Sequence, residues 1–342
     1  MEFENLLKLV QEEPNIEICE ALLLKADKYD RIKKLLETAE KIRDEFFGRN
    51  LKLDSFVYPV KKCVMEKYCI YCSNYVEKFR LESLKLEEFC LAIDFLKDCG
   101  AEMLTLEGGY NEDNSQLIEY VKISSREGLD VAVDTYPIRG EELDVLRDKV
   151  SEIYASIEIA EKELFQYFKP GESFDFRLKL AEEIMKRKIS LSSTVLIGLP
   201  GTDYRVWLKA LFWMKKLGVK HVSISSFQPV LGTPLEKFYP LPSTKVAKFV
   251  ALARILLKES DITACGSVND LSSLPLMLLA GVNRAYLGPY VCRIRSKTGF
   301  ADEVDEIFKP NYEVKFSNNL VFVNPFNAVE KVCKEFDFEV KQ

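Results

Sequence analysis

At 342 residues with an apolar fraction of 47%, the chain is long enough for one large α/β barrel or two ordinary domains. Its net charge of −6 argues against a general attraction to nucleic acid or anionic membrane, and no apolar run reaches the roughly 20 residues that span a bilayer. The single histidine, His221, argues against His-rich metal sites and against Ser-His-Asp hydrolysis.

The cysteine content indicates a reducing compartment. Nine cysteines occur, and residues 1–11 are typical of the start of an acidic amphipathic helix rather than of a signal peptide. In the cytosol, closely spaced cysteines indicate metal or redox chemistry rather than disulfides. We therefore expect a cytoplasmic protein with no nucleic-acid partner and no membrane partner.

Residues 1–48 are predicted to be helical, because apolar residues recur at helical spacing on both sides of a break at Pro14. An extended apolar run then ends at a cysteine-rich loop, and helical and extended segments alternate from there. The predicted strands are 53–60, 102–106, 129–135, 152–159, 190–197, 219–227, 261–265 and 282–287, and the predicted helices between them are 84–99, 115–127, 141–149, 174–188, 203–217, 243–259 and 270–280.

This alternation is typical of βαβ units and a parallel sheet. Eight strands are the number that a (β/α)8 barrel of the TIM type requires, so we expect that α/β fold. A helical extension at 1–50 would precede the barrel at 51–295, and a C-terminal α/β cap at 296–342 would carry an acidic helix, a strand at 320–323 and a last helix. The alternative is a doubly wound open sheet, which needs a glycine-rich first turn where this chain has the cysteine loop.

Polar and glycine-rich segments follow the predicted strands, where the active site of a barrel lies. The cysteine loop follows the first strand, Glu107-Gly108-Gly109 the second, and Asp134 the third. Glu158 ends the fourth, and Gly198 follows the fifth. These segments are therefore expected to meet at one rim.

Cys63, Cys69 and Cys72 form a Cys-x5-Cys-x2-Cys motif. Three thiolates this close in sequence can hold three irons of a [4Fe–4S] cluster and leave the fourth iron open for chemistry. The alternatives are a zinc site that lacks a ligand, or three unrelated buried thiols. Zinc prefers four ligands and no fourth candidate lies nearby, so the motif favours a redox-active iron–sulfur site.

Placed after the first strand of a barrel, this motif resembles that of the radical S-adenosylmethionine (SAM) enzymes. Most of them carry Cys-x3-Cys-x2-Cys, with an aromatic residue in the position of Tyr71. The wider first gap resembles that of the HmdB/HcgA-type radical SAM proteins, which are implicated in making the iron-guanylylpyridinol cofactor of [Fe]-hydrogenase. Biotin synthase and the [FeFe]-hydrogenase maturase HydE are relatives of that family. The resemblance covers roughly residues 50–290.

The resemblance implies an oxygen-sensitive enzyme that reductively cleaves SAM at a [4Fe–4S] cluster to give a 5′-deoxyadenosyl radical. The substrate would be a small precursor of the pyridinol, and the electron donor a protein such as ferredoxin or flavodoxin. Glycine after the second strand would let the backbone approach the amino group of SAM, and Arg177 would pair with its carboxylate. The implied cluster ligands are Cys63, Cys69 and Cys72, and the implied SAM contacts are Tyr71, Glu107, Gly108, Gly109, Glu158, Arg177, Ile197 and Gly198.

Several assignments stay open at this point. Glu161 could replace Glu158 as the SAM contact, and Arg177 could lie on a solvated helix face. No catalytic residue is assigned, and the candidates for substrate contact are Tyr136, Gln228, Arg284 and Tyr290. The alternative functions are another radical SAM reaction on an amino acid or cofactor precursor, and a non-enzymatic iron–sulfur carrier or scaffold.

The remaining cysteines divide into two sets. Cys19, Cys90 and Cys99 fall on apolar helical faces and are expected in the core. Cys265, Cys292 and Cys333 have no tight spacing but leave a second metal site open. His221 lies inside a predicted strand, so we expect it to be packed rather than catalytic.

Overall fold

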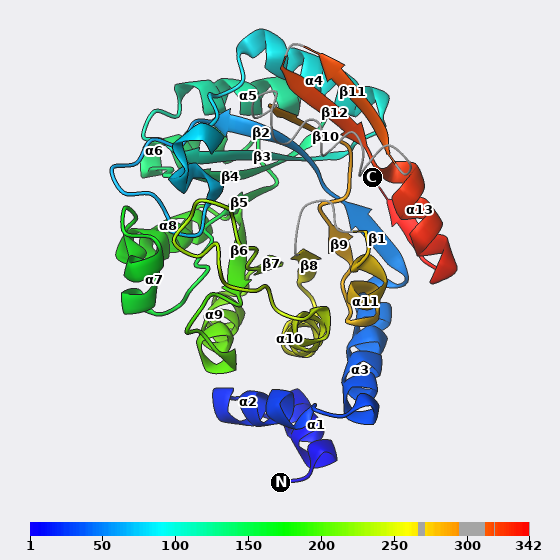
Figure 1. Ribbon diagram of the computed structural model, residues 1–342. Helices are drawn as coiled ribbons and strands as arrows, with labels where there is room; N and C mark the ends of the chain where they lie inside the picture. Colours follow the sequence, from blue (N-terminus) through cyan, green and yellow to red (C-terminus); the bar gives the residue numbers. More distant parts are fainter. Residues whose placement is uncertain (266–270, 294–311, 318, 342) are drawn as a thin grey trace.

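The computed structural model describes residues 1–265, 271–293, 312–317 and 319–341. Three N-terminal helices, α1 (Phe3–Glu12), α2 (Ile16–Lys25) and α3 (Tyr29–Phe47), confirm the helical extension. The break near Pro14 is fixed by Asn15, whose side chain accepts a hydrogen bond from the backbone of Ile18 at the start of α2. These helices pack on two helices beneath the sheet, α9 (Tyr204–Leu217) and α10 (Ser243–Leu256) (Figure 1).

A curled, mostly parallel sheet forms the body of the molecule, with helices on its outer side (Figure 1). Its parallel strands confirm the expected α/β class and come from the segments where apolar residues run continuously. They are β1 (Asn50–Leu53), β2 (Ser55–Lys61), β3 (Met103–Tyr110), β4 (Asp130–Tyr136), β5 (Glu152–Tyr154), β6 (Ser190–Ile197), β7 (His221–Ser226), β8 (Asp261–Cys265) and β9 (Arg284–Ala285).

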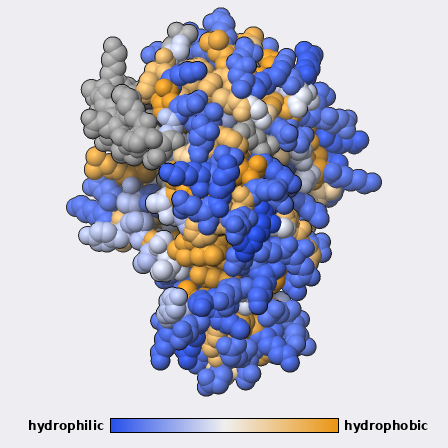
Figure 2. Space-filling model, turned by 90° about the vertical axis from the view of Figure 1, so that its right-hand side faces the viewer, coloured by the Kyte–Doolittle hydropathy of each residue, from blue (hydrophilic) through white to orange (hydrophobic). Residues whose placement is uncertain are grey.

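The outer helices match the predicted ones to within a few residues. One helix that the sequence analysis missed, α7 (Lys162–Phe168), stands between β5 and the following helix. The others are α4 (Leu86–Asp98), α5 (Ser115–Arg126), α6 (Gly140–Leu146), α8 (Phe174–Lys186), α9 (Tyr204–Leu217), α10 (Ser243–Leu256) and α11 (Leu274–Leu279). Within the described residues, none of the helices is long and apolar enough to cross a membrane. The face in Figure 2 is mostly hydrophilic, with apolar side chains in smaller patches between.

The predicted first strand is interrupted, and the interruption brings the two ends of the barrel together. β1 pairs with β9, whereas β2 pairs with β10 (Tyr290–Arg293) on one side and β3 on the other. Asp54 lies between the two halves, and its backbone bonds both Ala285 and Gly288. The first and eighth strands therefore lie side by side.

The C-terminal segment contributes strands to both edges of the sheet. β11 (Glu313–Ser317) and β12 (Leu320–Asn324) add antiparallel strands next to β10, and β13 (Glu339–Lys341) adds a parallel strand to β1. The last helix, α13 (Phe326–Glu335), is confirmed. The predicted acidic helix lies outside the described residues.

A buried ion-pair network fills the barrel below the strand ends. The Arg284 guanidinium binds the carboxylate of Asp54 at 2.8 Å and that of Glu152 at 2.5 Å. Burial opposes ionisation of Glu152, but His221 and Arg284 hold its pKa below the usual range. His221 also bonds Tyr154 at 2.8 Å, which confirms that it is packed. The network ties the link between β1 and β2, at Asp54, to β5, β7 and β9.

Because Arg284 is the cation that offsets two buried carboxylates, Arg284→Met should lower the free energy of unfolding by about 3–5 kcal/mol. The matched control is Arg205→Met, since Arg205 pairs with Glu17 and Glu20 on the surface and its loss should cost less than about 1 kcal/mol. Chemical denaturation at neutral pH measures both values. Equal losses would contradict a structural role for the network.

Candidate functional site

One cavity of about 420 Å³ opens at the carboxyl ends of the strands. Its wall is built from the cysteine loop, the ends of β3 to β7 and the segment around α7 and α8. The predicted site residues on this wall are Cys63, Cys69, Tyr71, Cys72, Glu107, Gly108, Gly109, Tyr136, Glu158 and Arg177.

Five other predicted residues lie elsewhere. The Ile197 side chain is fully buried in the main core, and Gly198 approaches Leu241. Gln228 is exposed after β7. Arg284 belongs to the ion-pair network, and Tyr290 stacks on Phe56 with ring centroids 4.5 Å apart. A position after a strand predicts that a residue lies near the rim of the barrel. The direction of its side chain then decides whether it reaches the cavity.

The cysteine loop lacks regular structure and is held by close backbone contacts. Val64 donates to the carbonyl of Tyr110 at 2.7 Å, and Ile70 donates to that of Phe168 at 3.0 Å. A Cβ on Gly109 would lie 2.3 Å from the Cβ of Cys63, and one on Gly171 would lie 2.2 Å from the carbonyl oxygen of Lys67. Only glycine fits at these two contacts, so the loop is clamped from both sides.

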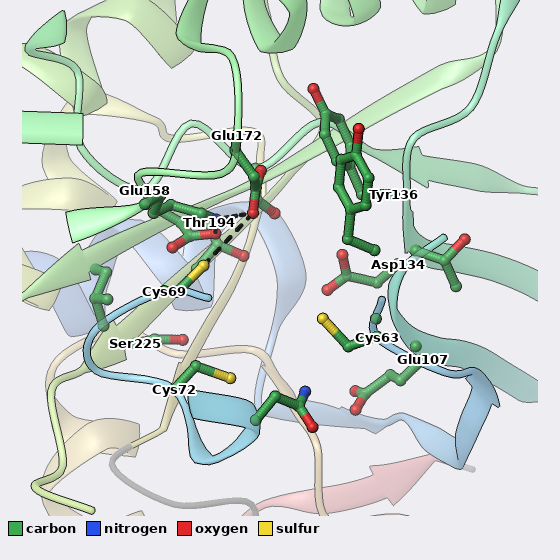
Figure 3. Close-up of a pocket in the computed structure, with 18 of the residues that line it drawn as sticks. Cys63, Cys69, Cys72, Glu107, Asp134, Tyr136, Glu158, Glu172, Thr194 and Ser225 are labelled. Carbon is green, nitrogen blue, oxygen red and sulfur yellow. Dashed lines mark hydrogen bonds and ion pairs between the residues drawn. The ribbon is translucent and has the colours of Figure 1, made fainter. Parts of the chain in front are cut away.

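The three thiols of Cys63, Cys69 and Cys72 are free and face a common space (Figure 3). Burial raises the pKa of Cys63, and burial raises that of Cys69 far more, so a bound cation is needed to hold both as thiolates. Across the described residues, no three His, Cys, Asp or Glu side chains converge on a single metal ion. The donor set fits a polynuclear cluster, in which each thiolate holds a different iron, better than mononuclear zinc.

A charged wall stands beside Cys69. Lys169 bonds Glu158 at 2.5 Å and Glu172 at 3.1 Å, and Arg177 bonds Glu172 through Nε at 2.9 Å. The Cys69 thiol lies 3.7 Å from the same Glu172 carboxylate. Although burial opposes ionisation, Arg177 and Lys169 hold the pKa of Glu172 well below its usual range. Each buried acid of this wall is thus paired with a buried base.

Sequence reasoning missed Lys169 and Glu172. The available signal was the run Lys-Pro-Gly-Glu, in which charged residues flank a turn that packs on the cysteine loop. The structure also separates two candidates: Glu158 lines the cavity, whereas Glu161 pairs with Lys209 on the outer side. Glu158 has a φ of +53°, a sparsely populated conformation for this residue type, and donates from its backbone to Thr194 at 2.7 Å.

Arg177 and Tyr71 are already engaged within this wall. The Arg177 guanidinium lies 3.6 Å from the centroid of the Tyr136 ring, so it is buried rather than solvated. The Tyr71 hydroxyl donates to the carboxylate of Glu158. Both side chains are therefore positioned before any ligand binds.

A second pair of carboxylates lines the opposite part of the wall. Glu107 on β3 and Asp134 on β4 are register partners, and Figure 3 shows both side chains directed into the cavity. Burial and the neighbouring Asp134 raise the pKa of Glu107 to about 8. Burial raises the pKa of Asp134 to about 6. The sequence analysis placed Asp134 at the rim but did not assign it to the site.

Of the remaining cysteines, Cys265, Cys292 and Cys333 lie on separate elements. Cys19 is buried as predicted, whereas the prediction for Cys90 was wrong because this residue lies on the exposed side of α4. Cys99 is half-buried, Cys292 is half-buried on β10, and Cys333 is buried in α13. Cys265 ends β8, and its side chain lies outside what the structure describes.

Two family models match this sequence. The model of the radical SAM superfamily matches residues 57–214, and that of the Biotin and Thiamin Synthesis associated domain matches residues 223–312. The chain is 27% identical to 3-methylornithine synthase of Methanosarcina acetivorans over 76% of each chain. It is also 27% identical to biotin synthase of Pelotomaculum thermopropionicum, over 84% of this chain and 93% of that one.

Solved structures share the fold. The crystal structure of methylornithine synthase superposes with a TM-score of 0.75 at 21% identity, over 98% of this chain and 97% of that one. The maturase HydG from Carboxydothermus hydrogenoformans superposes with a TM-score of 0.77 at 18% identity, over 99% of this chain and 79% of that one. Both agree with the curled α/β sheet described above.

The raised pKa of Glu107 makes stability depend on pH. The folded chain retains a proton on this carboxyl up to about pH 8, facing Asp134, Asp54 and Tyr286, whereas the unfolded chain loses it near pH 4.3. Stability conferred by that proton is lost as the pH rises between these values, with a slope of up to about 1.4 kcal/mol per pH unit. The stability gained by Glu107→Gln should therefore grow from pH 5 to 8 and then level off.

Chemical denaturation of the cluster-free, reduced protein across this pH range measures the effect. Glu112→Gln is the control, because Glu112 is an exposed acid that pairs with Arg139. A pH-independent difference between Glu107→Gln and the wild type would contradict the raised pKa.

Proposed function

Because this chain belongs to the radical SAM superfamily and is a radical SAM enzyme that uses a [4Fe–4S] cluster and SAM, we propose that its cavity is the site of SAM cleavage. When bound, cluster and SAM supply one-electron cleavage that yields a 5′-deoxyadenosyl radical. The observation that carries the proposal is that Cys63, Cys69 and Cys72 open onto the same cavity as Glu158 and Arg177.

Cys63, Cys69 and Cys72 are the proposed cluster ligands. The clamp at Gly109 and Gly171 supports this assignment, because it fixes the loop without any regular secondary structure. Three cysteines leave one iron without a protein ligand, which is where SAM would bind. The matched charges beside Cys69 would exclude water from that point while keeping the wall close to neutral.

The proposed SAM contacts are those at which the wall offers suitable polar groups. Nη1 of Arg177 takes part in neither bond to Glu172, so it is placed to pair with a carboxylate. Backbone carbonyl oxygens at Gly108 and Gly109 would accept hydrogen bonds from the amino group of SAM. Tyr71 would orient the Glu158 carboxylate toward the ribose of SAM. The predicted contacts at Ile197 and Gly198 would be limited to backbone atoms, since the Ile197 side chain is buried in the core.

We further propose that the enzyme acts in biosynthesis of the iron-guanylylpyridinol cofactor of [Fe]-hydrogenase, on a precursor of the pyridinol. The five-residue gap between Cys63 and Cys69 favours this branch of the superfamily. The alternative is another reaction of the biotin synthase and methylornithine synthase group, on an amino acid or cofactor precursor. A small electron-transfer protein such as ferredoxin or flavodoxin would supply the electron, in a reducing cytoplasm.

Replacing any one of the three cysteines by alanine should abolish formation of 5′-deoxyadenosine. The reason is that two thiolates do not hold the cluster in the geometry that leaves one iron open. Anaerobic reconstitution with iron and sulfide, followed by dithionite and SAM, measures cluster content and product. Cys90→Ala is the matched control, because this cysteine is exposed on α4 and should leave both values unchanged. A triad variant that still cleaves SAM would overturn the assignment.

Deletion of the gene in its own organism tests the pathway. The deletion strain should lack active [Fe]-hydrogenase but should retain the apoenzyme, which added cofactor should reactivate. Full [Fe]-hydrogenase activity in the deletion strain would favour the alternative reaction, without changing the assignment of the cluster.

A further inference from the structure

Two carboxyl groups in the cavity have no ion-pair partner among the described residues. Glu107 and Asp134 face each other across β3 and β4, and in the part of the chain that the structure describes neither carboxylate makes a hydrogen bond or ion pair. The other two acids on the wall differ, because Glu158 and Glu172 are matched by Lys169 and Arg177. No ion pair balances these two carboxyl groups; with a pKa of about 8 Glu107 keeps its proton at neutral pH, whereas Asp134, with a pKa of about 6, is ionised there.

This pair lies deeper in the barrel than the thiols. Gly109 contacts Cys63, and Glu107 comes two residues earlier on β3, which is about 6–7 Å toward the barrel floor. At that depth the neighbour is Tyr286, whose pKa is raised by burial and by Asp54, Asp134 and Glu107. The Tyr286 hydroxyl bonds Tyr154 and so is fixed from below.

Three buried hydroxyls at the same cavity also lack a hydrogen-bond partner. Thr135 is 3% exposed and Tyr136 and Ser156 are each 5% exposed; all three line the cavity, and their hydroxyl oxygens have no hydrogen-bond partner in the described residues. Burying a hydroxyl with no partner costs stability, so a native protein keeps one mainly where a ligand completes it. These hydroxyls are an observation independent of the two carboxylates.

We propose that the deep end of this cavity, formed by Glu107, Asp134 and Tyr286, binds the cationic amino group of the substrate, which is thus a protonated amine. The inference rests on the proposed function and names its substrate class. An ammonium group supplies the missing positive charge and up to three donors for the surrounding oxygens. A divalent metal ion is less well matched, since the described residues offer no third ligand there.

An amine at the deep end also leaves the end of the cavity near the thiols to SAM. The backbone at Gly108 and Gly109 stays available to SAM near the thiols, while the Glu107 side chain points to the deeper end. A substrate anchored by its amino group would extend from the floor toward the cluster, which leaves its carbon chain facing the reacting end of SAM. For the cofactor pathway, the precursor would carry an amino group at this step.

The test uses n-butylammonium chloride as the probe and butan-1-ol as its neutral counterpart. Calorimetric titration into the reconstituted, SAM-saturated protein should show binding of the ammonium and much weaker binding of the alcohol. Glu107→Gln and Asp134→Asn should each weaken ammonium binding about tenfold, which corresponds to one lost charge-assisted contact. The control Glu112→Gln should bind it like the wild type, and Asp134→Asn and Glu112→Gln should both keep the wild-type affinity for SAM.

Three results would overturn the inference: no ammonium binding to the wild type, equal binding of the alcohol, or a loss of SAM affinity in Asp134→Asn that parallels its loss of ammonium affinity. The last result would assign the pair to SAM. Release of 5′-deoxyadenosine is measured on the same samples. SAM cleavage without ammonium binding would contradict the amine-binding site but keep the proposed function. Ammonium binding without SAM cleavage would keep the amine-binding site but contradict the proposed function.

Discussion

The site depends on one steric constraint, the close approach of the cysteine loop to two glycines. The loop has no helix or strand of its own around its thiols, so its position comes from contact with the end of β3 and with the turn before α8. At Gly109 and Gly171 the backbones meet at distances that any Cβ would prevent. Three thiols are thereby fixed over the barrel by packing rather than by local secondary structure.

Charge is distributed in two layers beneath this loop. Near the thiols, Lys169 and Arg177 neutralise Glu158 and Glu172, which keeps a buried polar wall stable. Further down, Arg284 neutralises Asp54 and Glu152. Between the two layers, Glu107 and Asp134 are register partners on β3 and β4 that have no ion-pair partner among the described residues. The other buried acids of these two layers are each paired with a base. An unpaired couple of acids is therefore expected where a ligand supplies a positive charge.

The elements were largely predictable because each has a strong local signal. Continuous apolar runs marked the buried parallel strands, and helical spacing marked the outer helices. The departures have tertiary causes. The first strand is divided at Asp54, where pairing passes from β9 to β10, and β5 ends before Glu158, whose backbone has left the extended region. The C-terminal strands join the sheet edges, a pairing between distant segments that local patterns do not encode.

By itself, the sequence determined that three cysteines follow a strand of an α/β chain, and spacing together with strand order was enough to expect an iron–sulfur site at one rim. Only the tertiary structure decided which other residues reach that site. It moved Arg284 into the core, separated Glu158 from Glu161, and brought Lys169, Glu172 and Asp134 into the wall. The reason is that spacing along the chain fixes where a residue lies on its element, whereas contacts such as Cys69 with Glu172 and Arg284 with Glu152 form only when segments more than a hundred residues apart meet.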